Sequence, residues 1–116
     1  MTEWQEVHSS RFSSAIIATT ANEIFGGDQT TRDKVDRYGS HNSLIINSIA
    51  DENIAIDLDG ITARRMSILV GIGGFFIIKP EDGIFFNTVR LVNLSGTNTS
   101  ADEVNVRLAR ANKVSD

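Results

Sequence analysis

The stretch from residue 73 to residue 94, GGFFIIKPEDGIFFNTVRLVNL, constrains the fold of this chain more than any other segment. It holds both Phe-Phe pairs and the only Pro of the sequence. Two apolar runs, rich in β-branched and aromatic residues and too short for helices, flank the polar residues 79–83. Pro80 presets φ for a turn, and Gly83 tolerates a positive φ at its end. The pattern predicts a β-hairpin or two adjacent strands of a sandwich.

Residues 44–60, LIINSIADENIAIDLDG, contain two further apolar runs. The second run alternates, with Ile54, Ile56 and Leu58 on one face of a strand. Residues 50–53, between the runs, are typical of a turn. The segment therefore predicts a second hairpin.

Residues 104–108 alternate between aliphatic and polar side chains. We expect Val104, Val106 and Leu108 to face the core, because successive side chains of a strand point to opposite faces. Asn105 and Arg107 should then face outward. Similar short runs, separated by turn residues, continue along the chain without a pattern for a long helix. The sequence predicts an all-β fold: an antiparallel β-sandwich or jelly-roll-like arrangement of seven or eight short strands, with at most one short helix.

A chain of 116 residues is large enough to bury one hydrophobic core, so we expect a single domain. We assign residues 14–110 to the β-sandwich, residues 1–13 to an N-terminal arm with at most one short strand, and residues 111–116 to a polar C-terminal tail. The arm carries Trp4 and Phe12. Such large apolar side chains must be buried, either on their own domain or on a neighbouring molecule.

Residues 26–42 form a long connection whose only substantial apolar side chains are Val35 and Tyr38. A cap at Thr30 or Thr31 would permit one or two helical turns. Connections of this length are usually functional or mobile. The segment is therefore a candidate contact surface, with a disordered loop as the alternative.

The composition is ordinary for a soluble globular protein, with 41% hydrophobic residues, 22% charged residues and a net charge of −4. The negative charge argues against a nucleic-acid partner. No apolar run approaches the roughly 18 residues of a membrane helix, and the N-terminus lacks a signal-peptide pattern, so we expect no membrane partner. The absence of Cys excludes disulfides and thiolate metal sites.

No motif indicates catalysis, a cofactor or a metal. His8 and His41 are the only histidines, and without ligand spacing we interpret them as isolated surface residues. Residues 57–60, DLDG, begin like a calcium-binding loop, but Ile68 stands where that loop needs a bidentate Glu. Residues 71–74, GIGG, lack the following helix of a nucleotide site. We therefore expect a protein that is not an enzyme.

The two Phe-Phe segments are apolar at positions of both parities, unlike the alternating strands. Burial of one face alone would leave a row of Phe and Ile side chains in water, so another segment or another copy of the chain must cover them. We expect a homo-oligomer with this apolar surface at or near the subunit contact. The candidate interface residues are Trp4, Phe12, Val35, Tyr38, Phe75, Phe76, Ile78, Phe85 and Phe86.

Two segments, residues 44–60 and the closing DGIFFNTVRLVNLSGTNTSADEVNVRLAR at residues 82–110, resemble the small β-sandwich proteins that decorate or cement the virions of tailed phages. Shared features are an apolar strand followed by Asn, a small turn, an alternating strand and a late strand near the C-terminus. The resemblance implies a non-enzymatic structural protein of the virion, made in the host cytoplasm. It also implies a homo-oligomer, with a trimer favoured, that attaches to the major capsid protein or to another protein of the capsid or tail lattice.

An alternative function is a β-sandwich module that binds a small ligand or a carbohydrate. Trp4, Tyr38 and the two Phe pairs would then line its pocket. A stable oligomer in solution would favour the structural role, whereas a monomer that responds to a ligand would favour the binding module.

Overall fold

Eight β-strands and one α-helix form the described part of the chain, in agreement with the predicted all-β class. The structure is a computed structural model that describes residues 3–14, 23–50, 52–61, 64–68, 74–100 and 102–115. Of the glycine-rich residues 71–74, all but the last lie outside these ranges. The strands are β1 (Glu3–Ser14), β2 (Glu23–Phe25), β3 (Ser43–Ser48), β4 (Ile54–Leu58), β5 (Arg65–Ile68), β6 (Gly74–Ile78), β7 (Val89–Asn93) and β8 (Val104–Ser115). The helices are α1 (Gln29–Tyr38) and the short 3-10 helix η2 (Pro80–Asp82).

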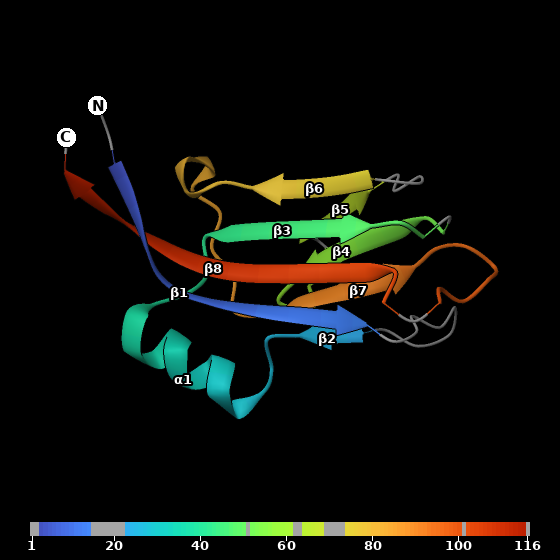
Figure 1. Cartoon of the computed structure of the whole chain (residues 1–116), viewed down its shortest axis with the longest axis horizontal. Helices are drawn as coiled ribbons and strands as arrows, with labels where there is room; N and C mark the ends of the chain where they lie inside the picture. The colour runs from blue at the N-terminus through green and yellow to red at the C-terminus, as the bar shows by residue number, and fades with distance from the viewer. Residues whose placement is uncertain are drawn as a thin grey trace.

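The strands form two antiparallel sheets of four strands each, stacked as two layers (Figure 1). The first sheet has the order β1-β8-β3-β6, and the second has the order β2-β7-β4-β5. Each strand therefore lies in the opposite sheet from the strand before it, except β5, which follows β4 in the second sheet. The pairs β1–β8, β2–β7, β3–β6 and β4–β5 are nested, as in one long hairpin folded over on itself. This arrangement is a jelly roll.

The core lies between the sheets and consists of side chains that alternate inward from both. Val104, Val106 and Leu108 of β8 are buried, whereas Asn105 is exposed and Arg107 is partly exposed, as predicted. Other fully buried apolar side chains include Leu44, Ile46, Ile54, Ile56, Leu58, Phe86, Val89 and Leu91. Burial of such a side chain contributes roughly 1.5–3 kcal/mol, so this layer is the main source of stability.

Neither of the two predicted hairpins is present. β3 and β4, which flank residues 50–53, belong to opposite sheets, and so do β6 and β7, which flank residues 79–83. The turn at residues 79–83 does form, because Pro80 begins η2 and Gly83 adopts a φ of 69°. Alternation shows which face of a strand is buried but not which strand is its partner. In a nested arrangement most partners are distant in sequence.

The predicted N-terminal arm and C-terminal tail are instead paired strands of the first sheet. β1 pairs with β8 along its whole length, from Glu3 opposite Ser115 to Ser14 opposite Val104. Pairing of β8 with β3 stops at Ala109, and beyond it β1 and β8 continue as a two-stranded ribbon that projects past the sandwich (Figure 1). The side chains of this ribbon are mostly polar, so the sequence shows no apolar alternation there.

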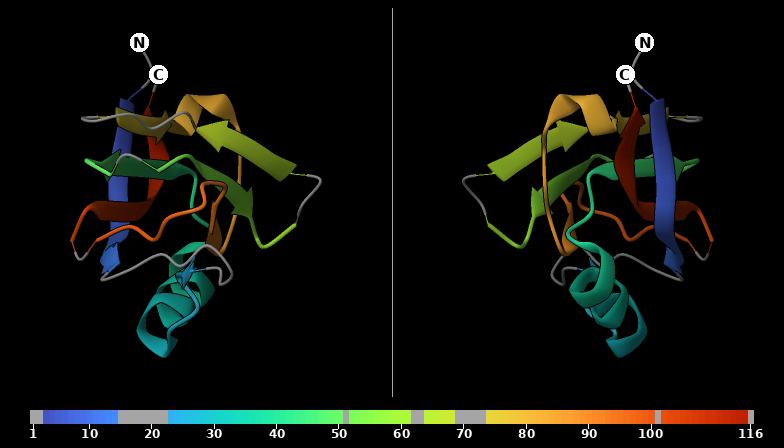
Figure 2. Two further views of the ribbon diagram at one scale, coloured as in Figure 1. Left: turned by 90° about the vertical axis from the view of Figure 1, so that its right-hand side faces the viewer. Right: turned by 90° about the vertical axis from the view of Figure 1, so that its left-hand side faces the viewer.

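The long connection at residues 26–42 contains α1, which is longer than the one or two turns expected and lies beside the edge strands β1 and β2 (Figure 2). Its cap is Asp28 rather than either threonine predicted for that role. The Asp28 carboxylate accepts a hydrogen bond of 3.1 Å from the backbone N–H of Thr31. Toward β1, the Thr31 side chain is buried and Lys34 Nζ donates to the Ser9 carbonyl at 2.7 Å. The helix is thus tied to the edge of the first sheet.

Candidate binding surface

The outward side chains of the first sheet form two rows across its four strands, a surface that we call the outer face. Opposite one another in the first row are Arg11, Arg107, Ile45 and Ile77. The second row consists of Ser13, Asn105, Asn47 and Phe75. Both rows begin with polar side chains on β1 and β8 and end with apolar ones on β6. The outer face is therefore polar toward one edge of the sheet and apolar toward the other.

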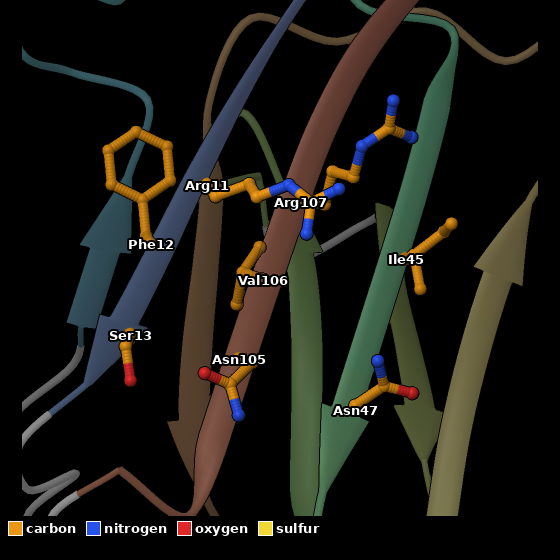
Figure 3. Close-up of a pocket in the computed structure, with 8 residues that line it drawn as sticks. All are labelled: Arg11, Phe12, Ser13, Ile45, Asn47, Asn105, Val106 and Arg107. Carbon is orange, nitrogen blue, oxygen red and sulfur yellow. The ribbon is translucent and has the colours of Figure 1, made fainter.

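A depression of about 480 Å³ lies in the outer face, a volume within the range of small-molecule sites. Its lining residues are Arg11, Phe12, Ser13, Ile45, Asn47, Asn105, Val106 and Arg107. Figure 3 shows the guanidinium groups of the two arginines toward one end and the side chains of Ser13, Asn47 and Asn105 toward the other. The depression therefore has a cationic end and a neutral polar end.

The cationic end has two guanidinium groups, of which only one forms an ion pair among the described residues. Arg107 forms an ion pair with the Glu6 carboxylate, and its Nε is buried without an acceptor in the described part of the chain. The hydrogen bond from Arg107 lowers the pKa of Glu6 by more than burial raises it, so this carboxylate is ionised at neutral pH. Arg11 lies opposite Arg107 but makes no hydrogen bond or ion pair among the described residues. At the polar end, Ser13 Oγ donates to the Asp102 carboxylate at 3.2 Å.

His8 and His41 are buried neighbours, which contradicts their interpretation as isolated surface residues. Their ring centroids are 5.1 Å apart, and the ring of His41 also packs against Phe86. Burial lowers the pKa of His41 to about 4 and lowers the pKa of His8 as well. His8 Nε2 lies 3.2 Å from the Gly39 carbonyl, whereas neither ring nitrogen of His41 makes a hydrogen bond of normal geometry with a described residue. At neutral pH the pair is an uncharged part of the interior beside α1.

The described ranges contain no group of three or more His, Cys, Asp or Glu residues placed to hold a metal ion. They also contain no helix that is long and apolar enough to cross a membrane. No family model, curated protein or solved structure matches this chain. Its function is therefore inferred from the outer face and its surroundings.

The nine predicted interface residues fall into three groups. Four are exposed: Trp4, Tyr38, Phe75 and Phe85. Three are partly buried: Phe12, Val35 and Phe76. The remaining two, Ile78 and Phe86, are core residues, which contradicts their assignment to an interface.

The two Phe-Phe segments differ in structure although their sequences look alike. In β6 the side chains alternate, so that Phe75 and Ile77 point outward while their neighbours face the core. Residues 84–86 form a connection with a single β-bridge, from Phe86 to His41. The uninterrupted apolar row inferred from both parities is therefore absent. Of the predicted apolar surface, only the outward side of β6 is exposed on the outer face, through Phe75 and Ile77.

Sequence reasoning finds only part of the depression. It contains one of the predicted interface residues, Phe12, and none of the aromatic residues proposed for a ligand pocket. Four lining residues are missed: Arg11, Ser13, Ile45 and Asn47. The available signal is the outward orientation of Asn105 and Arg107, which the alternation of β8 predicts. Their neighbours depend on strand pairing, which no local pattern indicates.

Proposed function

We propose that this chain is a non-enzymatic structural protein that forms a homo-oligomer and attaches to the capsid or tail lattice of a phage. The resemblance of residues 44–60 and 82–110 to virion decoration proteins supports this placement and the attachment to a capsid or other virion protein. The jelly-roll fold is compatible with the role but does not decide it, because the architecture occurs in viral capsid proteins, lectins and cupins alike. The observation that carries the proposal is the edge strand β6.

β6 is an exposed and uncharged edge strand. Its sequence, GFFII, has no charged residue and no Pro, the devices by which edge strands commonly avoid pairing with another chain. Among the described strands it pairs with β3 alone. Phe75 and Ile77, on its outward side, are 64% and 42% exposed. These features favour a contact with another copy of the chain along this strand.

Two contributions would stabilise such a contact. Burial of Phe75 and Ile77 contributes about 1.5–3 kcal/mol for each side chain, and main-chain hydrogen bonds along the open edge add to it. Together with neighbouring contacts, these terms oppose an association cost of about 4–15 kcal/mol. Two β6 strands facing each other would close a dimer. The favoured trimer instead requires β6 to meet a different surface of the next copy.

Light scattering coupled to size-exclusion chromatography tests the assembly. The Ile77→Lys variant places a charge on the outward side of the edge strand, so it should shift the protein toward a monomer with an unchanged β circular-dichroism spectrum. Ile24→Lys is the matched control, because Ile24 is also exposed, on the edge strand β2 of the second sheet. A parent protein that is monomeric at micromolar concentration would contradict the proposal, as would equal dissociation of both variants.

Virion attachment needs a separate test. Quantitative mass spectrometry on phage particles, purified from cells that produce this chain, should find it at a fixed copy number relative to the major capsid protein. Its absence from the particles would contradict the virion placement and leave the oligomer proposal intact.

A further inference from the structure

The depression in the outer face supports an inference that does not depend on assembly. We propose that it binds a small carboxylate that also carries hydroxyl groups, the chemistry of a hexuronic acid. Three features combine in the proposal. They are a cationic end formed by Arg11 and Arg107, a polar end formed by Asn47 and Asn105, and a volume of about 480 Å³ that accommodates a sugar-sized ligand.

One guanidinium group of the cationic end makes no hydrogen bond or ion pair among the described residues, although the Glu6 carboxylate interacts electrostatically with both arginines. Arg107 is engaged by Glu6, whereas Arg11, directly opposite on β1, makes no hydrogen bond or ion pair there. Like charges directly opposite on neighbouring strands repel each other, so a second anion beside them would be stabilising. A carboxylate fits this role because it can accept two parallel hydrogen bonds from one guanidinium group.

The polar end offers donors and acceptors suited to hydroxyl groups. Asn47 and Asn105 lie opposite each other on β3 and β8, and each amide has two donor hydrogens and an acceptor oxygen. Ser13 lies opposite Asn105 on β1 and donates to Asp102. The Asp102 carboxylate would repel a second anionic group but can accept a hydrogen bond from a hydroxyl. The ligand is therefore anionic at one end only.

Apolar lining atoms narrow the ligand class further. Ile45 supplies the outward apolar side chain of the lining, because the side chains of Phe12 and Val106 pack toward the core. The C–H groups of a sugar ring can contact the Ile45 side chain, whereas an inorganic anion would use the cationic end alone. The depression lies over β1, β8 and β3, and the assembly contact lies along β6. Different variants therefore test the two proposals.

Titration with sodium glucuronate tests the site. Glucose is the matched probe without the carboxylate, and sodium acetate is the matched probe without the hydroxyl groups. Calorimetry should show tighter binding of glucuronate than of either probe. Two-dimensional amide NMR should place the shifts at Arg11, Asn105 and Arg107. A response that does not saturate, or shifts located elsewhere, would overturn the site.

Variants separate the contributions of the two ends. Arg11→Gln should weaken glucuronate binding about tenfold or more, because it removes a charged hydrogen-bond donor to the carboxylate. Arg32→Gln, at an exposed position of α1, is the matched control and should bind like the parent. Asn105→Leu should weaken the binding of glucuronate but not that of acetate. The NMR spectrum of each variant away from the depression verifies its fold.

Each competing result has a definite meaning. Equal affinities for glucose and glucuronate would overturn the role of the arginines. Equal affinities for acetate and glucuronate would overturn the role of the polar end. Equal losses in Arg11→Gln and Arg32→Gln would show that only the net charge of the protein matters, and would overturn the proposal as a whole.

Discussion

Arg90 of β7 donates two hydrogen bonds, of 2.6 and 3.1 Å, to the same carboxylate oxygen of Asp57 on β4. Asp57 is completely buried, and the two residues lie opposite each other in the second sheet. Because a shift in register would separate them, the pair fixes the alignment of β4 with β7. It also accounts for the DLDG segment at residues 57–60, whose first carboxylate serves an ion pair between strands.

Replacing Arg90 by Met should lower the free energy of unfolding by about 3 kcal/mol, because both hydrogen bonds to a buried carboxylate are lost. Thermal and urea denaturation measure the change. Arg107→Met is the matched control on the first sheet, where the partly exposed ion pair with Glu6 should contribute less than about 1 kcal/mol. If both variants lost the same free energy of unfolding, burial of Asp57 would not make its ion pair with Arg90 more stabilising than the partly exposed pair.

The Val106→Asp variant should fail to give soluble folded protein, because it places an unpaired charge in the core. Circular dichroism and solubility after expression measure the effect. Asn105→Asp introduces the same charge at the next position, on the exposed outer face, and should fold with nearly the stability of the parent. A Val106→Asp protein that melts like the parent would remove β8 from the core.

The free energy of unfolding should fall as the pH decreases from 6.5 to about 4. The folded chain holds the pKa of His41 at about 4, below its ordinary value of 6.5, so within this interval the unfolded chain binds a proton that the folded chain does not. The loss is on the order of 3 kcal/mol. His8, whose pKa is also lowered, contributes in the same direction. Urea denaturation at a series of pH values measures the slope.

His41→Phe tests whether this residue causes the pH dependence. Phe does not titrate and can pack beside Phe86, so the stability slope between pH 6.5 and about 4 should become shallower. Glu6 does not confuse the result, because its pKa is lowered below 4.5 and its contribution is lost mainly at lower pH. An unchanged slope would assign the dependence to other groups.

The Asp28→Ala variant should lose about 1 kcal/mol of stability, because the carboxylate caps the first turn of α1. Thermal denaturation measures this loss. Asp36→Ala removes an exposed carboxylate from the same helix without touching a cap, and should change stability by less than about 0.5 kcal/mol. If both variants lost the same amount, the cap would not be what holds the start of α1.

Sequence patterns predict strands where one face meets an apolar core. Residues 54–58 and 104–108 show this clearly, since burial of one side imposes a period of two. β1 gives no such signal, because its inward side at His8 and Ser10 packs against α1 rather than against an apolar core. Ser10 faces the first turn of the helix, and His8 faces the C-terminal end of the helix. The Thr31 hydroxyl of α1 donates to Ser10 Oγ at 3.2 Å, and His8 contacts the helix end. A strand that packs against a polar helix face therefore lacks apolar alternation, and from sequence alone it is interpreted as an unpaired arm.

The candidate site is predictable only at β8. Alternation places Asn105 and Arg107 outside the core, and the structure confirms both orientations. No local pattern indicates that Arg11 lies opposite Arg107, or that Asn47 lies opposite Asn105. These neighbours meet because β1 and β3 flank β8, and the sequence does not state which strands are adjacent.

The nested strand pairs impose an order on folding. β4 and β5 are close in sequence and can pair early, whereas β1 precedes all its neighbours and must wait for β8. During synthesis at about 5–20 residues per second, β1 therefore spends seconds without its only strand partner in the described sheet. Long-range pairing of this kind is slow, and an apolar strand exposed for that time would invite aggregation. The mostly polar sequence of β1 lacks the alternation by which a strand is predicted. The same polarity lowers the tendency of the unpaired strand to aggregate before β8 is made.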